Sequence, residues 1–164
     1  NRLKWVAYVG GKRETRRLMG DHIYDMHDAV KRREFPDAVV VEKREVDGHY
    51  QRKLKGAKED FLSTAMFHKT GGYYYIPFRS FYSRNLSNLM MAGRCFSCTH
   101  VGLCGPRVMN TCGQMGIATG FAAVVCKKHN ASPKEVGQTH IKELRELIGF
   151  DRVKLVNNPS KKGH

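Results

Sequence analysis

The chain has 164 residues, of which 41% are hydrophobic, and it carries a formal net charge of +14. This length is enough for one domain with an ordinary core but not for two full domains, and the hydrophobic content excludes a disordered chain. The positive charge excludes an acidic solvating segment. It favours a polyanionic partner, which means nucleic acid, a membrane surface or a phosphate-bearing cofactor.

No segment is predicted to span a membrane. The longest mainly apolar stretch, residues 115–126, is shorter than the ~20 residues that a span needs. The sequence shows no signal peptide and opens with Asn1 instead of Met. We therefore expect a processed, truncated or partial product, and we infer no compartment from the missing signal peptide.

The first half of the chain is predicted to contain short strands and one short helix. Strands are expected at residues 1–9, 17–24, 38–41 and 73–76. The helix is expected at residues 28–33, and it ends before Phe35-Pro36 because a residue that precedes proline avoids the helical region. Residues 12–17 form a basic run, and residues 51–60 are expected to be a charged loop or an exposed helix.

The second half is predicted to contain a short strand, a loop and two helices. The strand covers residues 88–92 and ends at Gly93, and the loop covers residues 102–106. A helix then runs from Arg107 to a stop at Asn130, with basic residues in its last turn. The motif Ser132-Pro133-x-Glu135 predicts a second helix to about residue 148, with a serine cap and proline in the first turn.

The start of the glycine-rich helix is the first candidate site. Gly113, Gly116 and Gly120 each cost the helix roughly 1 kcal/mol relative to alanine, which indicates that a ligand or another backbone approaches closely. A helix N-terminus offers unpaired N–H groups to a phosphate or a carbonyl, and Arg94 and Arg107 flank this one. The alternative is a packing helix with two surface arginines.

Three further patterns leave alternatives open. The run CFSCTHVGLC places Cys95, Cys98, His100 and Cys104 within ten residues, which fits a zinc site, a dithiol redox pair or incidental thiols. The basic run at residues 12–17 and the aromatic residues of 73–82 favour either nucleic-acid binding or a solvated surface. His49 has two possible roles: it acts as a general acid–base catalyst, or it is a structural histidine.

Several common motifs are absent from the sequence. It contains no G-x-G-x-x-G fingerprint, no Walker loop, no G-x-S-x-G elbow and no H-E-x-x-H motif. A self-contained nucleotide-binding enzyme is therefore not expected.

Read in order, five segments resemble one known family. They are residues 11–21 (GKRETRRLMGD), 33–39 (REFPDAV), 74–81 (YYIPFRSF), 88–100 (NLMMAGRCFSCTH) and 107–123 (RVMNTCGQMGIATGFAA). Together they are similar to the C-terminal part of bacterial FAD-dependent oxidoreductases of the glutathione-reductase-like superfamily. The resemblance spans roughly residues 11–150, and its last two segments are its most specific part.

The resemblance implies an α/β fold and FAD as the cofactor. In such flavoproteins the glycine-rich helix aims its N-terminus at the flavin pyrimidine carbonyl, and the preceding Gly–Arg turn approaches the ribityl and pyrophosphate groups. The cofactor-binding residues that this implies are Gly93, Arg94, Cys95, Arg107, Val108, Met109, Asn110, Thr111 and Gly113. It names no catalytic residue, and His49 and Arg79 are the candidates in the substrate domain. No metal site is predicted.

The resemblance also implies a domain division. Residues 1–84 correspond to part of the substrate domain, residues 85–150 to the C-terminal part of the FAD-binding domain, and residues 151–164 to a basic tail. Because the dinucleotide fingerprint is absent, we expect a fragment whose partner is the missing N-terminal half of the same enzyme, and which is inactive alone. The expected ligands are FAD and an unidentified small-molecule substrate. The alternatives are a basic nucleic-acid-binding module or a Cys-rich zinc or redox module.

Overall fold

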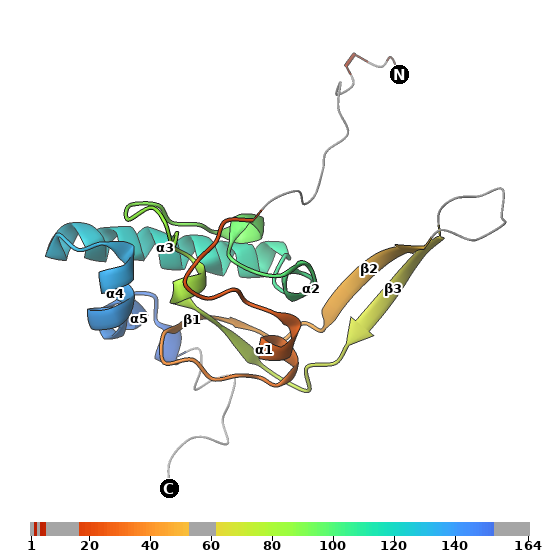
Figure 1. The fold of residues 1–164 in the computed structure, drawn as a ribbon, viewed down its shortest axis with the longest axis horizontal. Coiled ribbons are helices and arrows are strands. Elements are labelled where there is room, and N and C mark those ends of the chain that lie inside the picture. The colour runs from red at the N-terminus through yellow and green to blue at the C-terminus, as the bar shows by residue number, and fades with distance from the viewer. Residues whose placement is uncertain (1, 3, 6–16, 53–61, 153–164) are drawn as a thin grey trace, which may run out of the picture.

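The computed structural model describes residues 2, 4–5, 17–52 and 62–152. A long helix, α3 (Met109–His129), crosses the body of the molecule above a small sheet (Figure 1). The short helices α1 (Met26–Val30) and α2 (His100–Leu103) lie toward the N-terminal end of α3, and α4 (Pro133–Thr139) and α5 (Ile141–Leu147) lie at its C-terminal end. Two 3-10 turns, η1 (Phe78–Ser80) and η2 (Gly93–Cys95), connect the strands to α2 and α3.

The central sheet is formed by β1 (Ala38–Glu42) and β4 (Tyr74–Pro77), which pair antiparallel with Val40 opposite Ile76. The valine run of β1 favours extended backbone, and its first four residues are all buried. Both strands were predicted from the sequence, and both predictions are confirmed within one or two residues. Helix α3 packs against β1 of this sheet.

A β-hairpin extends away from this body (Figure 1). Its strands are β2 (Val46–Arg52) and β3 (Leu62–His68), which pair antiparallel from Val46 opposite His68 to Arg52 opposite Leu62. Neither strand was predicted from the sequence, in which Gln51 and Arg52 were expected to belong to a loop or an exposed helix. That assignment is wrong for these two residues, and most of residues 51–60 lies outside the described part of the chain.

One hydrophobic cluster forms the core. It extends from Tyr24 to Phe150 and combines aromatic side chains with one face of α3. Phe81 and Phe96 pack with their ring centroids 5.8 Å apart, and Tyr24 packs on Phe96 at 6.1 Å. The core therefore includes residues from both sides of the predicted boundary at residues 84/85, and that division stays a prediction.

Local capping explains where the helices begin and end. Ser132 and Glu135 form a capping box at the start of α4, with Pro133 in the first turn, as the sequence predicts. Asn130 adopts the left-handed conformation (φ 49°) that ends α3, also as predicted. The second predicted helix is instead two helices, because the backbone of His140 (φ −118°, ψ 15°) leaves the helical region between α4 and α5.

Three other local predictions are wrong. Residues 17–24 form no strand, and only Tyr24 makes a bridge there, to Cys98. Residues 88–92 form no strand either, because Met90 makes a single bridge to Tyr82. Part of the predicted loop at 102–106 belongs to α2, whose first turn is capped by the Thr99 side chain. Most of the predicted strand at 1–9, most of the basic run and most of the tail lie outside the described residues.

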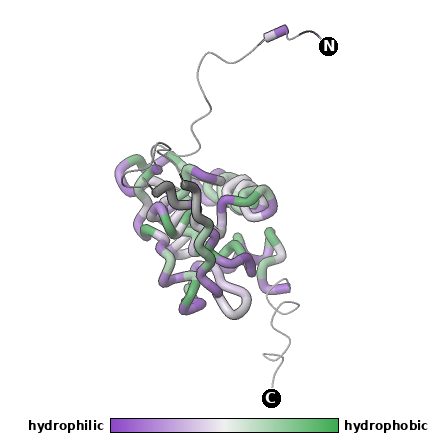
Figure 2. Tube along the Cα trace, turned by 90° about the vertical axis from the view of Figure 1, so that its right-hand side faces the viewer, coloured by the Kyte–Doolittle hydropathy of each residue, from purple (hydrophilic) through white to green (hydrophobic). Residues whose placement is uncertain are grey.

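The architecture is a mixture of helices and small sheets, consistent with an α/β class. Hydrophobic and hydrophilic residues are interspersed along the trace (Figure 2). Among the described residues, none of the helices has the length and apolar character required to cross a membrane.

Candidate functional site at the start of α3

Gly93 stands directly against the first turn of α3. Its backbone has a φ of +65°, which only glycine adopts without strain, and a Cβ at this position would lie 3.8 Å from Cβ and Sγ of Cys112. The glycine therefore allows the η2 turn to reverse next to the helix, with Cys112 at contact distance on the side where a Cβ would lie.

No side chain among the described residues caps the N-terminus of α3. Val108 occupies the cap position in an extended conformation and makes no capping hydrogen bond, and the first turn contains no acidic residue. In contrast, Asp25 caps α1, Thr99 caps α2 and Ser132 caps α4. The first backbone N–H groups of a 21-residue helix are thus left for another acceptor, at the positive end of the helix dipole.

A cavity of ≈ 460 Å³ opens between η2 and the start of α3, and it is lined by Gly93, Arg94, Arg107, Met109 and Cys112. Two of these five residues are arginines, and none is acidic. Met109 is 91% exposed, and Arg94 is exposed as well. The site therefore combines positive charge with open helix N–H groups, which suits an anionic or electron-rich group.

Arg107 is held by the protein at the wall of this cavity. Its Nε donates to the carbonyl oxygen of Cys104 (3.2 Å), and its Nη2 donates to the carbonyl oxygen of Asp47 (3.1 Å). The side chain is 15% exposed, and the same Nη2 lies 3.6 Å from the carboxylate of Asp47. Arg107 thus fixes the beginning of β2 against the turn that leads into α3.

Asp47 connects this arginine to one of the two catalytic candidates. Its buried carboxylate lies 3.1 Å from Nε2 of His49 and 3.1 Å from Nη2 of Arg44. The ring of His49 lies within ion-pair distance of Asp47, and because its side chain is 46% exposed it remains accessible. Asp47 thus lies between His49 and Arg107, and Arg107 lines the cavity.

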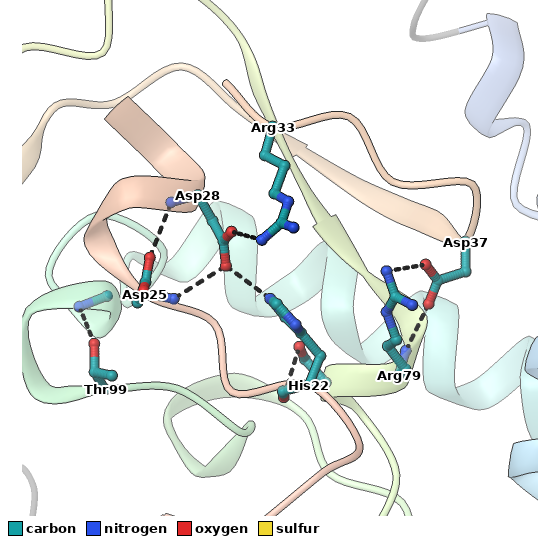
Figure 3. A network of polar contacts seen from close by, with 9 residues as sticks. His22, Asp25, Asp28, Arg33, Asp37, Arg79 and Thr99 are labelled. Atoms are coloured by element: carbon teal, nitrogen blue, oxygen red, sulfur yellow. Dashed lines mark hydrogen bonds and ion pairs between the residues drawn. The ribbon is translucent and has the colours of Figure 1, made fainter. Parts of the chain in front are cut away.

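The other catalytic candidate, Arg79, belongs to a different cluster (Figure 3). It pairs with Asp37 at 3.5 Å, and its guanidinium lies over the ring of Phe35. The backbone N–H of Arg79 also donates to the Asp37 carboxylate. These contacts fix the turn after β4, and the structure does not bring Arg79 together with His49.

The remaining predicted cofactor residues are distributed around the helix start. Val108 is the cap residue, and Cys95 is exposed in η2. Thr111 is buried and donates a hydrogen bond to the Glu42 carboxylate, so it fastens α3 to β1. Asn110 lines a second cavity, and Gly113 lies on an uncovered face of α3.

The second cavity, of ≈ 510 Å³, lies on the β1 side of the same helix start. Its apolar wall includes Ile117 and Phe150, and its polar groups include Glu42, Lys43, Asn110 and Gln114. Gln114 accepts a hydrogen bond from the backbone N–H of Val41 (3.2 Å). Sequence reasoning did not select Glu42, Lys43 or Gln114, nor Cys112 in the first cavity. The available signal was helical spacing: Gln114 lies four residues after Asn110 at the second cavity, and Cys112 lies three residues after Met109 at the first.

One face of α3 has no cover among the described residues. The buried face carries Thr111, Met115, Ala118, Ala122 and Val125. The opposite face is also apolar: Ile117, Phe121 and Val124 are exposed there, and a Cβ added at Gly113, Gly116 or Gly120 would meet nothing within 4 Å. The close approach that the glycines indicated is therefore not made within the described structure. A helix that is apolar on all sides is normally buried on all sides.

The cysteine-rich segment gives no support to a zinc or redox module. Cys98 and Cys104 are buried, whereas Cys95 is exposed, and burial raises the pKa of the Cys98 thiol to about 12. Within the ranges that the structure describes, these thiols and His100 do not form a group of three convergent metal ligands. A raised thiol pKa is the reverse of what a reactive dithiol needs.

The nucleic-acid alternative also lacks its expected aromatic surface. Five of the six aromatic residues of 73–82, namely Tyr74, Tyr75, Phe78, Phe81 and Tyr82, are buried in the core and cannot stack on bases. Tyr73 is half-buried, and Nζ of Lys43 lies over its ring. Arg13 and Arg16 of the basic run lie outside the described residues. Arg17 donates from Nε to the carbonyl oxygen of Cys98 (2.6 Å).

Comparison with known proteins adds one match. The profile of a family described as FAD dependent oxidoreductase matches residues 1–148. No curated protein and no solved structure matches the chain.

Proposed function

The chain belongs to the FAD dependent oxidoreductase family, whose cofactor is FAD, and from this premise we propose a more specific role. The chain is the C-terminal portion of a bacterial, glutathione-reductase-like flavoprotein. The cavity between η2 and α3 holds the flavin end of FAD. The observation that carries this proposal is the uncapped N-terminus of α3, which faces the backbone of Gly93 and the side chain of Arg94.

The residues at this cavity fit the flavin end of the cofactor. A reduced flavin carries negative charge near its pyrimidine carbonyl, and the open N–H groups of α3 and the exposed Arg94 supply the complementary field, whereas Arg107 is already paired with Asp47. Gly93 lines this cavity, and its φ of +65° lets the backbone turn beside the start of α3. No acidic residue of the first turn opposes such a group.

FAD, when bound, supplies the electron transfer between itself and the substrate. The protein's part is to bind and orient. The N–H groups at residues 109–111 donate toward the ligand, and Arg94 contributes an exposed guanidinium. Arg107 acts as a positioning residue, because its hydrogen bonds go to Cys104 and Asp47 and hold the helix start in place.

The uncovered face of α3 supports the missing-half part of the proposal. FAD is a dinucleotide, and the chain has no G-x-G-x-x-G fingerprint for its adenine half. The face with Ile117, Phe121, Val124 and the three glycines is suited to close helix or strand packing. We assign it to the dinucleotide-binding half of the same enzyme, so that the 164-residue chain alone is inactive and binds FAD weakly.

The substrate side is assigned to residues 1–84 and the FAD side to residues 85–150. On the substrate side, His49 is the candidate for proton transfer, because its exposed ring lies 3.1 Å from the Asp47 carboxylate, which also lies 3.6 Å from Arg107 at the cavity wall. The second cavity is the candidate position for an unidentified small-molecule substrate, since it flanks the same helix start and combines an apolar wall with Glu42, Lys43 and Asn110.

The proposal is tested by the absorption spectrum and intact mass of the protein from its natural source. We expect a flavin spectrum and a mass larger than that of 164 residues. A colourless protein with the mass of this chain would overturn the assignment. FAD titration of the 164-residue chain and of the longer protein is the companion measurement: equally tight binding by both would overturn the missing-half part.

A further inference from the structure

Two histidines and a glutamate gather at the end of α3 that is remote from the flavin cavity. The Nε2 of His129 lies 2.7 Å from Oε2 of Glu143, and the rings of His129 and His140 stack with their centroids 3.9 Å apart. One ligand-type atom from each of the three residues lies within 4.8 Å of the others. We propose that His129, His140 and Glu143 form a binding site for a divalent transition metal ion of the zinc class.

Each of the three residues is placed by a separate element of the backbone. His129 is the last residue of α3, which the left-handed Asn130 ends. His140 stands at the break between α4 and α5, where its carbonyl oxygen accepts from the N–H of Leu144. Glu143 lies in the first turn of α5. Figure 1 shows the three elements meeting at this end of α3. The site therefore needs no large backbone movement to form.

The donor set selects the class of metal. Two imidazole nitrogens and one carboxylate oxygen are the usual ligands of zinc and its late first-row neighbours, whereas calcium and magnesium prefer oxygen alone. Three protein ligands leave a position for water, as in open zinc sites. Because the two rings are stacked nearly parallel, they must turn out of this stack for both nitrogens to point at one ion. The donor atoms then lie about 2.0–2.2 Å from the metal ion. His129 and Glu143 are exposed or half-buried, so such rotations disturb no core packing.

One cation already competes for the carboxylate. Lys128 Nζ lies 2.8 Å from Oε1 of Glu143, and the lysine side chain is 64% exposed. An exposed lysine leaves such a pair at little cost, because surface ion pairs contribute about 0–1 kcal/mol. This contact gives the proposal a distinctive consequence: removing Lys128 favours metal binding if Glu143 is a ligand.

The site is structural and does not belong to the redox centre. α3 has 21 residues, and at about 1.5 Å per residue its two ends lie roughly 30 Å apart. A metal ion at His129, His140 and Glu143 joins the end of α3 to the α4 and α5 helices. It therefore stabilises the packing of these three helices, and its existence does not depend on the proposed FAD role.

The test is a zinc titration of the metal-stripped 164-residue chain, followed by calorimetry and by thermal unfolding. We expect one zinc ion per chain to bind and the Tm to rise. His140→Ala and Glu143→Gln should each lower the affinity at least as much as the loss of an outer-shell partner does, about 10–100-fold. His27→Ala, an exposed histidine on α1, is the matched control and should bind zinc like the original chain.

Two further measurements distinguish this site from zinc binding at the cysteines or at scattered surface groups. Lys128→Ala should keep or raise zinc affinity, and Lys127→Ala should leave it unchanged. The visible spectrum with cobalt in place of zinc should lack thiolate charge-transfer bands, which would instead point to the cysteines. The proposal is overturned if the chain binds no zinc, if His140→Ala and Glu143→Gln bind it like His27→Ala, or if Lys128→Ala weakens binding.

Discussion

The Nε2 of His22 lies 2.7 Å from Oδ2 of Asp28, and the Asp28 side chain is 4% exposed (Figure 3). The same carboxylate accepts from the backbone N–H of Asp25 and lies 3.3 Å from Nη1 of Arg33. Asp28 therefore closes the capping box of α1 and at the same time ties α1 to the segment that leads into the core. No other helix start in the described part of the chain combines a capping box with a buried carboxylate.

This arrangement predicts acid-sensitive stability. Burial by itself raises the pKa of Asp28, but hydrogen bonds from His22, Asp25 and Arg33 outweigh it, so the pKa lies below its usual value. The unfolded chain then takes up a proton at higher pH than the folded chain. The contribution of Asp28 is fully present above the usual value of about 4 and is lost as the pH falls through the folded pKa.

Asp28→Asn tests this prediction in urea unfolding between about pH 6 and pH 2. At pH 6 the variant should lose about 1–3 kcal/mol, because a buried carboxylate with several donors is replaced. Its unfolding free energy should then fall less steeply with acid than that of the original chain. His22→Ala should flatten the same limb of the curve. Parallel curves for all three proteins would contradict the role of this pair.

The elements that the sequence predicted are those with local signals. The valine run of β1, the Ser132 capping box and the stop at Asn130 each depend on residues within one turn or one strand, and each appears in the structure. The run at residues 88–92 has the composition of a buried strand but forms only one bridge, at Met90. Composition could not show that no neighbouring strand is available there.

Long-range contacts could not be predicted in this way. Strand β2 begins VDGHY, which lacks a clear apolar alternation, so its pairing with β3 was missed. The link between Arg107 and Asp47 joins residues 60 positions apart. The grouping of His129, His140 and Glu143 depends on two helix breaks, at Asn130 and His140, of which the sequence indicated only the first. The candidate flavin residues came from a family resemblance, and their role stays a prediction.

The second prediction concerns Gly93 at the cavity. Gly93→Ala should destabilise the chain by about 1–2 kcal/mol, because a φ of +65° is unfavourable for alanine. Gly149→Ala is the matched control, since Gly149 has a φ of +66° and the described residues place no atom within 4 Å of the added Cβ. If the cavity holds the flavin end, both variants lose similar stability in urea unfolding, but only Gly93→Ala lowers the FAD affinity of the longer protein. Equal FAD affinities would count against this location.

The third prediction concerns cysteine reactivity. With a thiol pKa of about 12, roughly one Cys98 in ten thousand is a thiolate at pH 8, and the side chain is buried. Iodoacetamide should therefore modify the exposed Cys95 in the folded chain and reach Cys98 only after urea is added. Peptide mass spectrometry measures both rates. Rapid native modification of Cys98 would restore the redox-dithiol alternative.

The fourth prediction uses the uncovered face of α3. Gly116→Ala and Gly120→Ala should each stabilise the 164-residue chain by roughly 0.5–1 kcal/mol, because alanine favours the helix and the added methyl group meets nothing within 4 Å. Gly137→Ala in α4 is the contrasting variant. Its added Cβ would lie 3.2 Å from Cδ1 of Phe78, so urea unfolding should show a loss of stability.

In the longer protein these two substitutions should be unfavourable. If the dinucleotide-binding half covers this face, the same methyl groups enter a close contact, and the purified protein with Gly116→Ala or Gly120→Ala should contain less FAD per chain than the original. Stability gained in the short chain together with FAD lost in the long one is the expected signature of glycines that serve an interface. Unchanged FAD content in both variants would mean that the face stays open in the assembled enzyme. The packing reason for the glycines would then be wrong.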